Sequence, residues 1–302
     1  MLQQAIAVAS GKGGVGKTSV AANVAGAAAL AGWRVLLVDL DPQGNVGDDL
    51  GYRARSDGGE GLHDAVLKRG RLGLEPLRNV RPGLDVVPAG EFTEDLATLL
   101  SARRNKAAGN EAAQAELLLL GQVLGGVAGE YHLVVLDTPP AGGVLLDAAL
   151  AVVRWLLIPT RRDAGSIQGL VRVARRFAEM RDTVNPELEV LGVVLFDFGA
   201  GHRRMVSDVR ASLSASLGET APVLKAFVRS APRASGDMRN AGQLAYEYEA
   251  ARARAMRSEE GPRPWEPGAV PFGANAPGLA EDYTRLTEEI LGTVSPKIGA
   301  AR

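Results

Sequence analysis

A glycine-rich segment near the start of the chain constrains the fold more than any other part of the sequence. Residues 5–9 are small and apolar, residues 11–19 read Gly-Lys-Gly-Gly-Val-Gly-Lys-Thr-Ser, and an alanine-rich stretch continues to Leu30. This order predicts a buried strand, a loop and a helix, with the helix N-terminus directed at an anion. Such a unit is typical of a parallel sheet covered by helices.

Within this segment, the pattern G-x-x-x-x-G-K-T gives the residue types a chemical reason. Glycines let backbone N–H groups surround phosphate oxygens, Lys17 reaches the β- and γ-phosphates, and the Thr18 hydroxyl ligates Mg²⁺. Lys12 is the unusual member, because most loops of this kind need a single lysine. The predicted nucleotide-binding residues are Gly11, Lys12, Gly13, Gly14, Val15, Gly16, Lys17, Thr18 and Ser19.

Acidic residues at the ends of two further apolar segments complete the predicted site. Residues 35–38 are apolar and lead to Asp39 and Asp41, and residues 133–136 lead to Asp137. Parallel sheets hold ligands at the carboxyl ends of their strands, so these carboxylates are expected beside the phosphate loop. We expect Asp41 to position the attacking water and Asp137 to hold Mg²⁺ through water. Asp39 is expected to organise Lys17 or the waters of the metal.

Composition excludes several other classes of protein. The 302 residues include no cysteine, which excludes disulfides, thiolate metal sites and iron–sulfur clusters. His63, His132 and His202 are widely spaced and suggest no metal cluster. No apolar run approaches the length that spans a bilayer, and the first residues are expected to start a strand rather than a signal peptide.

The rest of the chain alternates between strand-like and helix-like segments. This alternation predicts a doubly wound, mostly parallel α/β sheet with helices on both faces. Residues 1–302 are expected to form a single domain with an irregular arm at about 258–277. The predicted strands are residues 34–39, 83–88, 132–137, 155–159, 190–196 and 222–228, and the predicted helices are residues 62–68, 91–101, 112–124, 166–181, 203–217, 237–257 and 278–291.

Three motifs together resemble the deviant-Walker-A ATPases of the ParA/MinD family, most closely the ParA-type DNA-partition ATPases. The motifs are Lys-Gly-Gly-Val-Gly-Lys-Thr at 12–18, Val-Asp-Leu-Asp-Pro-Gln-Gly-Asn at 38–45 and Leu-Asp-Thr-Pro-Pro at 136–140. A looser resemblance continues through residues 157–160 and 192–194, so most of residues 1–240 is covered. The resemblance implies the fold of a P-loop NTPase, with ATP and Mg²⁺ as cofactors.

The same resemblance implies a slow ATPase in which ATP acts as a dimerisation and binding switch. Two ATP-bound protomers would face each other, and Lys12 would reach the partner's phosphates, so that Lys12, Lys17 and Asp41 form the catalytic set. The homodimer would bind DNA nonspecifically, and a ParB-like or other adaptor would stimulate hydrolysis. Its role would be to position a plasmid, a chromosome or another cargo, in the cytoplasm and on the nucleoid.

Nonspecific DNA binding needs basic side chains that neutralise phosphates, and the later half of the chain supplies them. Residues 151–240 contain 14 basic and 9 acidic side chains, a net charge of +5. The candidate DNA contacts are Arg203, Arg204 and Arg233. With aromatic residues at 5%, contact with the duplex backbone fits better than base stacking.

The helix predicted at 166–181 carries a second group of arginines. At about 100° per residue, its apolar face consists of Ile167, Leu170, Val171, Ala174, Phe177 and Ala178. Arg172, Arg175 and Arg176 fall on the other face, which is either a solvated surface or a further contact with DNA.

The sequence is also compatible with two other functions. A MinD-like relative would bind a membrane through an amphipathic C-terminal helix. The last predicted helix is a poor anchor, because it opposes Glu281, Asp282, Glu288 and Glu289 with only Arg285, so no membrane partner is expected. The other possibility is a soluble metabolic enzyme with a P-loop.

The chain departs from the family pattern in two places. Family members often carry Asn or Thr just after the Gly-Val-Val strand, and a Pro-Arg pair near the adenine. Here these places read Leu195-Phe196-Asp197 and Phe227-Val228-Arg229. The sequence therefore does not identify the residues that contact the adenine.

Overall fold

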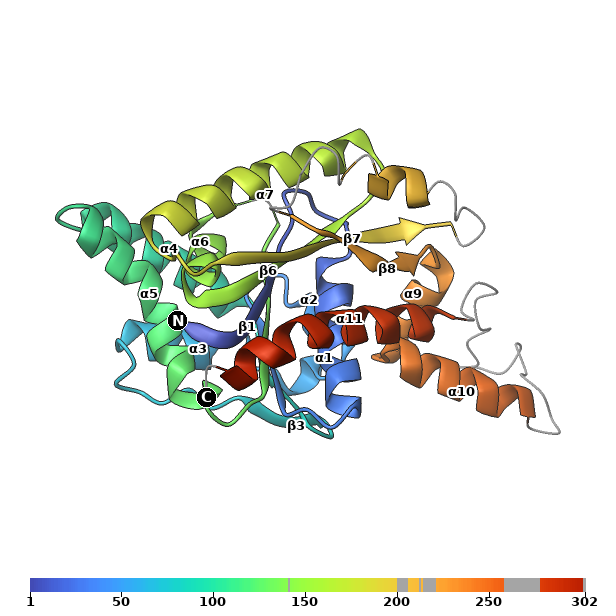
Figure 1. Cartoon of the computed structure of the whole chain (residues 1–302). Coiled ribbons are helices and arrows are strands. Elements are labelled where there is room, and N and C mark those ends of the chain that lie inside the picture. Colours follow the sequence, from blue (N-terminus) through green and yellow to red (C-terminus); the bar gives the residue numbers. More distant parts are fainter. Residues whose placement is uncertain (141, 200–205, 212, 214–220, 258–277, 301–302) are drawn as a thin grey trace.

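A computed structural model gives the arrangement of the chain and describes residues 1–140, 142–199, 206–211, 213, 221–257 and 278–300. A twisted sheet runs through the middle of the molecule with helices on both sides (Figure 1). Both ends of the chain lie on the same side of the molecule in this view.

The described strands form one eight-stranded sheet in the order β3-β4-β2-β5-β1-β6-β7-β8. Neighbouring strands are parallel throughout, except that β3 is antiparallel to β4 at the edge. The predicted fold class is therefore confirmed. The strands are β1 Leu2–Val8, β2 Val35–Asp39, β3 Leu77–Arg81, β4 Leu84–Val87, β5 Leu133–Asp137, β6 Val153–Thr160, β7 Glu189–Phe198 and β8 Val223–Arg229.

The helices pack on the two faces of the sheet. One face and its helices share an apolar core that includes Leu36, Val38 and Leu136, and the other face shares a core that includes Val35, Leu37 and Val135. This alternation follows from the period of two along each strand. The helices of the first face are α3 Glu60–Leu67, α4 Glu91–Lys106, α5 Asn110–Ala128, α6 Val144–Val152 and α7 Ala164–Thr183, and those of the second are α1 Lys17–Leu30, α2 Asn45–Asp49, α9 Pro232–Ala241, α10 Ala245–Arg257 and α11 Leu279–Ala300.

One predicted helix, residues 237–257, is wrong in its extent. The chain forms α9 and α10 instead, with Gly242 between them in the left-handed conformation at φ 59°. A Cβ on Gly242 would lie 2.5 Å from the Cα of Gly51, so only glycine fits this contact. Glycine just after a helix whose last turn carries a basic residue, here Arg239, is a common C-terminal signal, and it was readable in the sequence.

The last helix is longer than the sequence suggested. It was predicted to end at Leu291, but α11 continues to Ala300 with Pro296 inside it. The edge strand β3, the short helix α2 and the buried helix α6 were not predicted. All nine residues of α6 are buried, so its sequence lacks the polar stripe that marks a surface helix.

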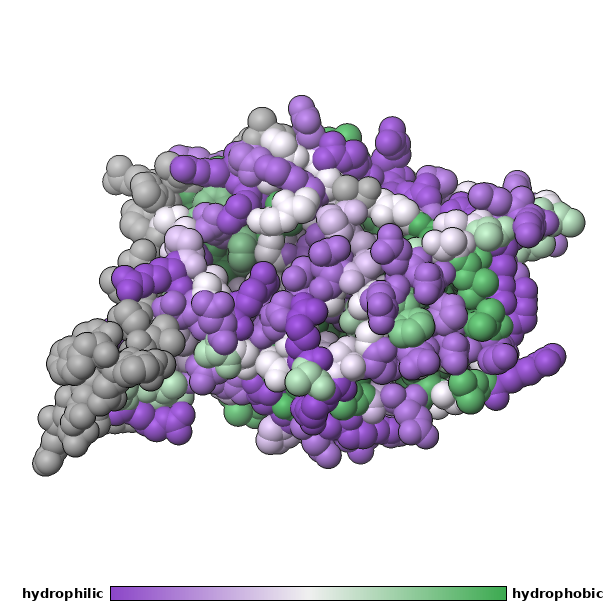
Figure 2. Space-filling model, turned by 180° about the vertical axis from the view of Figure 1, so that it is seen from behind, coloured by the Kyte–Doolittle hydropathy of each residue, from purple (hydrophilic) through white to green (hydrophobic). Residues whose placement is uncertain are grey.

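Apolar side chains that remain exposed are scattered over different elements. The back of the molecule is mostly hydrophilic, with apolar atoms in separate small groups (Figure 2). Among the described residues, no helix is both long and apolar enough to cross a membrane.

Candidate functional site

The predicted phosphate loop lies between β1 and α1 at the carboxyl end of the sheet. Gly16 precedes α1 in the left-handed conformation at φ 86°, which turns the chain into the helix. Lys17 is 6% exposed. Burial lowers the pKa of its ammonium group, while the carboxylates of Asp137 and Asp41 act in the opposite direction. The loop therefore has the local structure that the motif predicts.

The two predicted acidic strand ends meet beside this loop. β2 and β5 are neighbours, and their register places Asp39 directly beside Asp137. Both residues are fully buried. Burial raises the pKa of Asp137 to about 7, against the nearby Thr18 hydroxyl and Lys17 ammonium, which lower it. Burial also raises the pKa of Asp39, and the charge of Asp137 adds to this effect.

The unpaired oxygens of these carboxylates fit a role around a divalent cation. Asp39 Oδ1 accepts a hydrogen bond from the Asp41 N–H at 2.9 Å. Asp39 Oδ2 and both carboxylate oxygens of Asp137 have no hydrogen-bond partner of normal geometry among the described residues. Buried acceptors of this kind are normally satisfied by protein, water or an ion, and Mg²⁺ usually keeps several of its waters. These oxygens are therefore suited to waters around a cation held by Thr18.

A protein-only metal cage is not part of this arrangement. Among the described residues, no group of three or more His, Asp or Glu side chains could hold a metal ion. Magnesium in phosphate loops takes most of its ligands from a hydroxyl, waters and the nucleotide, so the predicted role of Thr18 does not require such a group.

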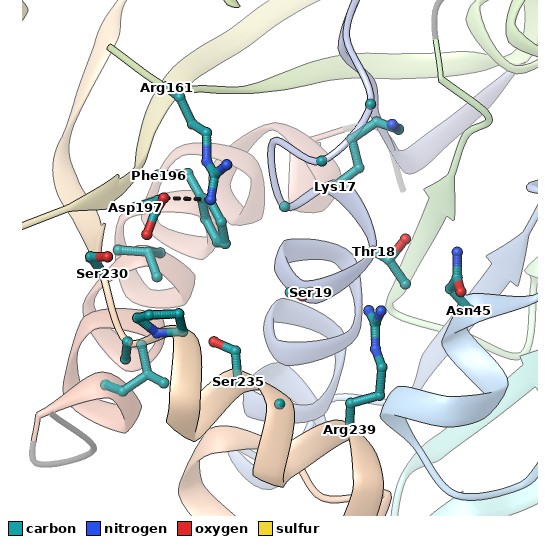
Figure 3. Close-up of a pocket in the computed structure, with 18 of the residues that line it drawn as sticks. Lys17, Thr18, Ser19, Asn45, Arg161, Phe196, Asp197, Ser230, Ser235 and Arg239 are labelled. Carbon is teal, nitrogen blue, oxygen red and sulfur yellow. Dashed lines mark ion pairs between the residues drawn. The ribbon is translucent and has the colours of Figure 1, made fainter. Parts of the chain in front are cut away.

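A cavity of about 540 Å³ opens in front of the loop. Of the predicted residues, Gly13, Gly14, Gly16, Lys17, Thr18, Ser19 and Asp41 line it. Figure 3 shows Thr18 and Asn45 on one side and Arg161, Phe196 and Asp197 on the other. Gly11, Lys12 and Val15 are not among the lining residues. Gln43, Asn45 and Pro140 also line the cavity and belong to the quoted motifs, although no role was assigned to them. The sequence did not single out the following lining residues for the site: Arg161, Ser230, Ala231, Pro232, Ser235, Gly236, Arg239, Leu279 and Tyr283.

Asp41 lies at the edge of this cavity and is nearly buried. Its Oδ1 accepts a hydrogen bond from the Gln43 N–H at 3.1 Å, which fixes the loop after β2. The carboxylate therefore has a defined position in the cavity that Lys17 and Thr18 also line, and its role in orienting water stays a prediction.

The second lysine of the loop points elsewhere. Lys12 Nζ forms an ion pair with Asp163 Oδ1 at 2.6 Å. Asp163 caps the N-terminus of α7 by accepting a hydrogen bond from the Ser166 N–H. The contact with Lys12, followed by that with Ser166, holds the pKa of the Asp163 carboxyl well below its usual range. The two lysines are thus separated, with Lys17 in the cavity and Lys12 outside it.

Helix α7 also supports the loop from behind. The Arg172 guanidinium donates to the Gly11 carbonyl from Nη2 at 2.6 Å and from Nε at 3.2 Å. A Cβ on Gly11 would lie 2.1 Å from the carbonyl oxygen of Gly169, so the two backbones touch. The first residues of the loop are therefore held by α7 as well as by β1.

This packing corrects the predicted faces of α7. Val171, assigned to the apolar face, is 66% exposed, while Val173 and Met180 are buried. Arg172 binds the loop, and Arg176 pairs with the buried Asp147 of α6. Two of the three arginines on the predicted polar face, Arg172 and Arg176, therefore make contacts within the fold.

The structure describes one of the three predicted DNA contacts. Arg233 is exposed on α9. Arg203 and Arg204 lie outside the described residues, as do the predicted arm at 258–277 and most of the predicted helix at 203–217.

The end of the cavity far from Thr18 carries the residues that depart from the family pattern. A Cβ on Gly16 would lie 2.4 Å from the Phe196 ring, so this ring packs directly on the loop. Asp197 adopts φ 66°, which is uncommon for a residue other than glycine, and pairs with Arg161. The Arg161 guanidinium lies 5.9 Å from the centre of the Phe196 ring. An aromatic ring and an ion pair therefore stand where the family often has Asn or Thr.

Comparisons with known proteins identify the family to which this fold belongs. A family model described as an AAA domain matches residues 3–190. The chromosome partitioning protein ParA of Caulobacter vibrioides is 32% identical over 68% of this chain and 75% of its own length. The chromosome-partitioning ATPase Soj of Thermus thermophilus is 35% identical over 71% of this chain and 77% of its own length.

A solved structure adds the same fold with ligands. The cobyrinic acid a,c-diamide synthase of Mycobacterium smegmatis, with a bound ATP analogue and magnesium, superposes with a TM-score of 0.64. It is 25% identical and covers 84% of this chain and 93% of its own. From the loop, the acidic strand ends and these similarities together, the chain belongs to the ParA/MinD family of P-loop ATPases.

Proposed function

We propose that this protein is a Mg²⁺-dependent ATPase of the ParA type, acting as an ATP-bound homodimer that binds DNA and positions a cargo. The observation that carries this proposal is the separation of the two loop lysines. Lys17 lines the cavity, whereas Lys12 lies outside it on Asp163. A lysine that does not serve its own nucleotide is available for the nucleotide of a second protomer.

Residues inside the cavity supply the cis half of the reaction. The backbone N–H groups of the loop and Lys17 bind the phosphates, and Thr18 holds Mg²⁺. The bound Mg²⁺ neutralises charge that develops on the phosphates. Asp137 and Asp39 accept hydrogen bonds from waters around Thr18, and Asp41 orients the attacking water.

Lys12 supplies the trans half. In the dimer it leaves Asp163 and approaches the partner's phosphates, where a cation stabilises the leaving group. Each site is incomplete without this lysine, so hydrolysis is slow in the monomer. An adaptor of the ParB type raises the rate by favouring the complete site.

DNA binding is assigned to the basic surface in the later half of the chain. Arg233 is exposed on α9, the helix that also contributes Arg239 to the cavity, so nucleotide and DNA contacts share one element. Arg203 and Arg204 are the further candidates from the sequence. The active unit comprises residues 1–302 as a single domain, located in the cytoplasm on the nucleoid.

Co-sedimentation with duplex DNA tests this function. The full chain is incubated with DNA and ATP, ADP or no nucleotide, at low and at high salt. We expect binding with ATP that falls steeply as salt increases, because phosphate contacts release counterions. Replacing Arg233 by Ala should weaken this binding for every DNA sequence tested. Binding to vesicles without binding to DNA would contradict the proposal.

The MinD-like alternative is disfavoured by the last helix. Leu286, Ile290 and Val294 on α11 are fully buried against the core. A membrane anchor must expose its apolar face, and this face is already covered.

A metabolic ligase is the second candidate, favoured by the likeness to the diamide synthase. Such an enzyme needs a site for an acceptor molecule next to the γ-phosphate. A strong rise in ATP hydrolysis on adding DNA and adaptor, without any small-molecule acceptor, would exclude this candidate.

A further inference from the structure

Arg239 is a cationic side chain in the nucleotide cavity that neither the sequence motifs nor the family resemblance singled out. It lies in the last turn of α9 and lines the cavity with Lys17, Thr18 and Ser19. In Figure 3 its side chain rises from α9 toward Thr18, with both terminal nitrogens at the tip. An arginine in this position needs a physical explanation.

One edge of the guanidinium is already fixed. Arg239 Nε donates to Asp49 Oδ1 at 2.7 Å, and Asp49 is the last residue of α2. Asp49 is almost fully buried, and its burial raises its pKa, against hydrogen bonds from Arg239 and Ser19. The carboxylate therefore sits between Ser19 on α1 and Arg239 on α9, and holds the planar guanidinium in one orientation.

The backbone around this pair is also held tightly. Gly242, just after α9, touches Gly51, just after α2. Arg81 donates from Nη1 to the Leu50 carbonyl at 3.2 Å and from Nη2 to the Gly242 carbonyl at 2.9 Å. The ends of α2 and α9 thus form a rigid support for the Arg239 side chain.

The other edge of the guanidinium has no fixed partner in the protein. The Arg239 Nη atoms make no hydrogen bond to any residue that the structure describes. The side chain is 44% exposed, and the space it faces is the cavity. Four N–H donors are therefore directed at whatever the cavity contains.

The position of Ser19 identifies the part of the ligand involved. In a phosphate loop the lysine reaches the β- and γ-phosphates, and the backbone N–H groups of the loop and of the helix start surround the α- and β-phosphates. Ser19 follows Thr18 and contacts the same carboxylate that holds Arg239. The guanidinium is therefore at the α-phosphate end of the cavity.

We propose that Arg239 binds the α-phosphate of the nucleotide through its Nη groups, with Asp49 holding the guanidinium in place. This inference rests on the proposed nucleotide function. With this contact, α9 touches the bound nucleotide through Arg239 and exposes Arg233 on the surface of the molecule.

Nucleotide affinity of the full chain tests the proposal. The dissociation constants of ATP, ADP, AMP and adenosine are measured with Mg²⁺ by competition against a fluorescent ADP derivative. Arg239→Gln should weaken ATP, ADP and AMP alike by about tenfold or more, since it removes charge-assisted hydrogen bonds to a phosphate that all three carry. Adenosine should be unaffected. Arg254→Gln, an exposed arginine of α10, is the matched control and should change none of the four.

A second variant separates binding from stability. Arg239→Gln leaves the buried Asp49 carboxylate without its cation, which lowers stability. The double variant Arg239→Gln with Asp49→Asn removes both charges and should recover the melting temperature without recovering affinity.

Three results would overturn the proposal. Wild-type affinity in Arg239→Gln would show that the side chain does not touch the ligand. Recovery of affinity together with stability in the double variant would show a purely structural role, and a loss confined to ATP would place Arg239 at the γ-phosphate. Failure of the wild-type chain to bind any nucleotide would instead overturn the proposed function itself.

Discussion

Lys12 and Asp163 form an ion pair 2.6 Å long that holds the second lysine of the phosphate loop against the start of α7. The two side chains are 42% and 43% exposed, so water screens the pair and little free energy is needed to open it. Asp163 thus acts as a substitute anion for Lys12 in the isolated protomer.

Replacing Asp163 by Asn should increase the amount of ATP-bound dimer. The variant removes the competing charge, while its amide oxygen still caps α7 at Ser166. We expect the dimerisation constant to rise roughly two- to fivefold, the range for an exposed pair. Light scattering with a slowly hydrolysed ATP analogue measures the dimer. Asp182→Asn, at the other end of α7, is the control, and an unchanged constant in Asp163→Asn argues against competition.

Replacing Lys12 by Ala should leave nucleotide binding measurable and remove the stimulated reaction. Lys12 lies outside the cavity, so the affinity for ADP should stay close to that of the wild type. Adaptor-stimulated hydrolysis should fall by about a hundredfold or more, the effect typical of losing one group that stabilises transition-state charge. Unchanged turnover would refute the role of Lys12 in the partner's site.

Replacing Asp41 by Ala should trap the dimer in its ATP-bound form. The carboxylate orients the attacking water, so its loss slows phosphate release and leaves the phosphate contacts of Lys17 intact. Phosphate release and dimer lifetime are measured together. Glu60→Ala, an exposed acid of α3, serves as the comparison, and normal phosphate release in Asp41→Ala would show that another group orients the water.

Without Mg²⁺ and nucleotide, the protein should become less stable as the pH rises from about 4 toward 7. The pKa of buried Asp137 is raised to about 7, so the folded chain keeps a proton there that the unfolded chain has already lost. Stability falls with pH wherever the folded state binds more protons. Asp137→Asn should flatten this slope in urea unfolding. An identical slope in the variant would mean that Asp137 is already ionised in the folded protein.

The contact between Gly11 and Gly169 should tolerate no side chain. Gly169→Ala places a Cβ 3.1 Å from the backbone of Gly11, and either the loop or α7 must move. We expect a loss of about 1–3 kcal/mol in the free energy of unfolding, together with weaker nucleotide binding. Gly125→Ala, on an open face of α5, is the matched control and should instead stabilise the protein by about 0.5–1 kcal/mol.

The sequence was sufficient for those parts of the site that depend on strand ends. Asp39 and Asp137 were expected at one edge of a parallel sheet, and they lie side by side in the register of β2 and β5. A run of apolar residues that ends at an acidic residue predicts a strand end from the local sequence alone.

Contacts made across the fold could not be predicted in the same way. Asp163 is 151 residues from Lys12, and Asp49 is 190 residues from Arg239. Neither pair follows a local period, so no motif announces it. The face of α7 was misassigned for a related reason. Both Val171 and Val173 fit an apolar stripe. The orientation of α7, and so which valine is buried, depends on the contact between Gly169 and Gly11, which are far apart in the sequence.

The insertion of β5 between β1 and β2 has a consequence for the order of events during synthesis. The ribosome completes the phosphate loop and Asp41 long before residues 133–137 emerge, yet β1 and β2 have no common border until β5 fills the gap. A nascent chain that ends before Asp137 therefore lacks the strand that joins β1 to β2. We therefore expect the phosphate loop and Asp41 to reach their final relative positions only after almost half of the chain has been translated.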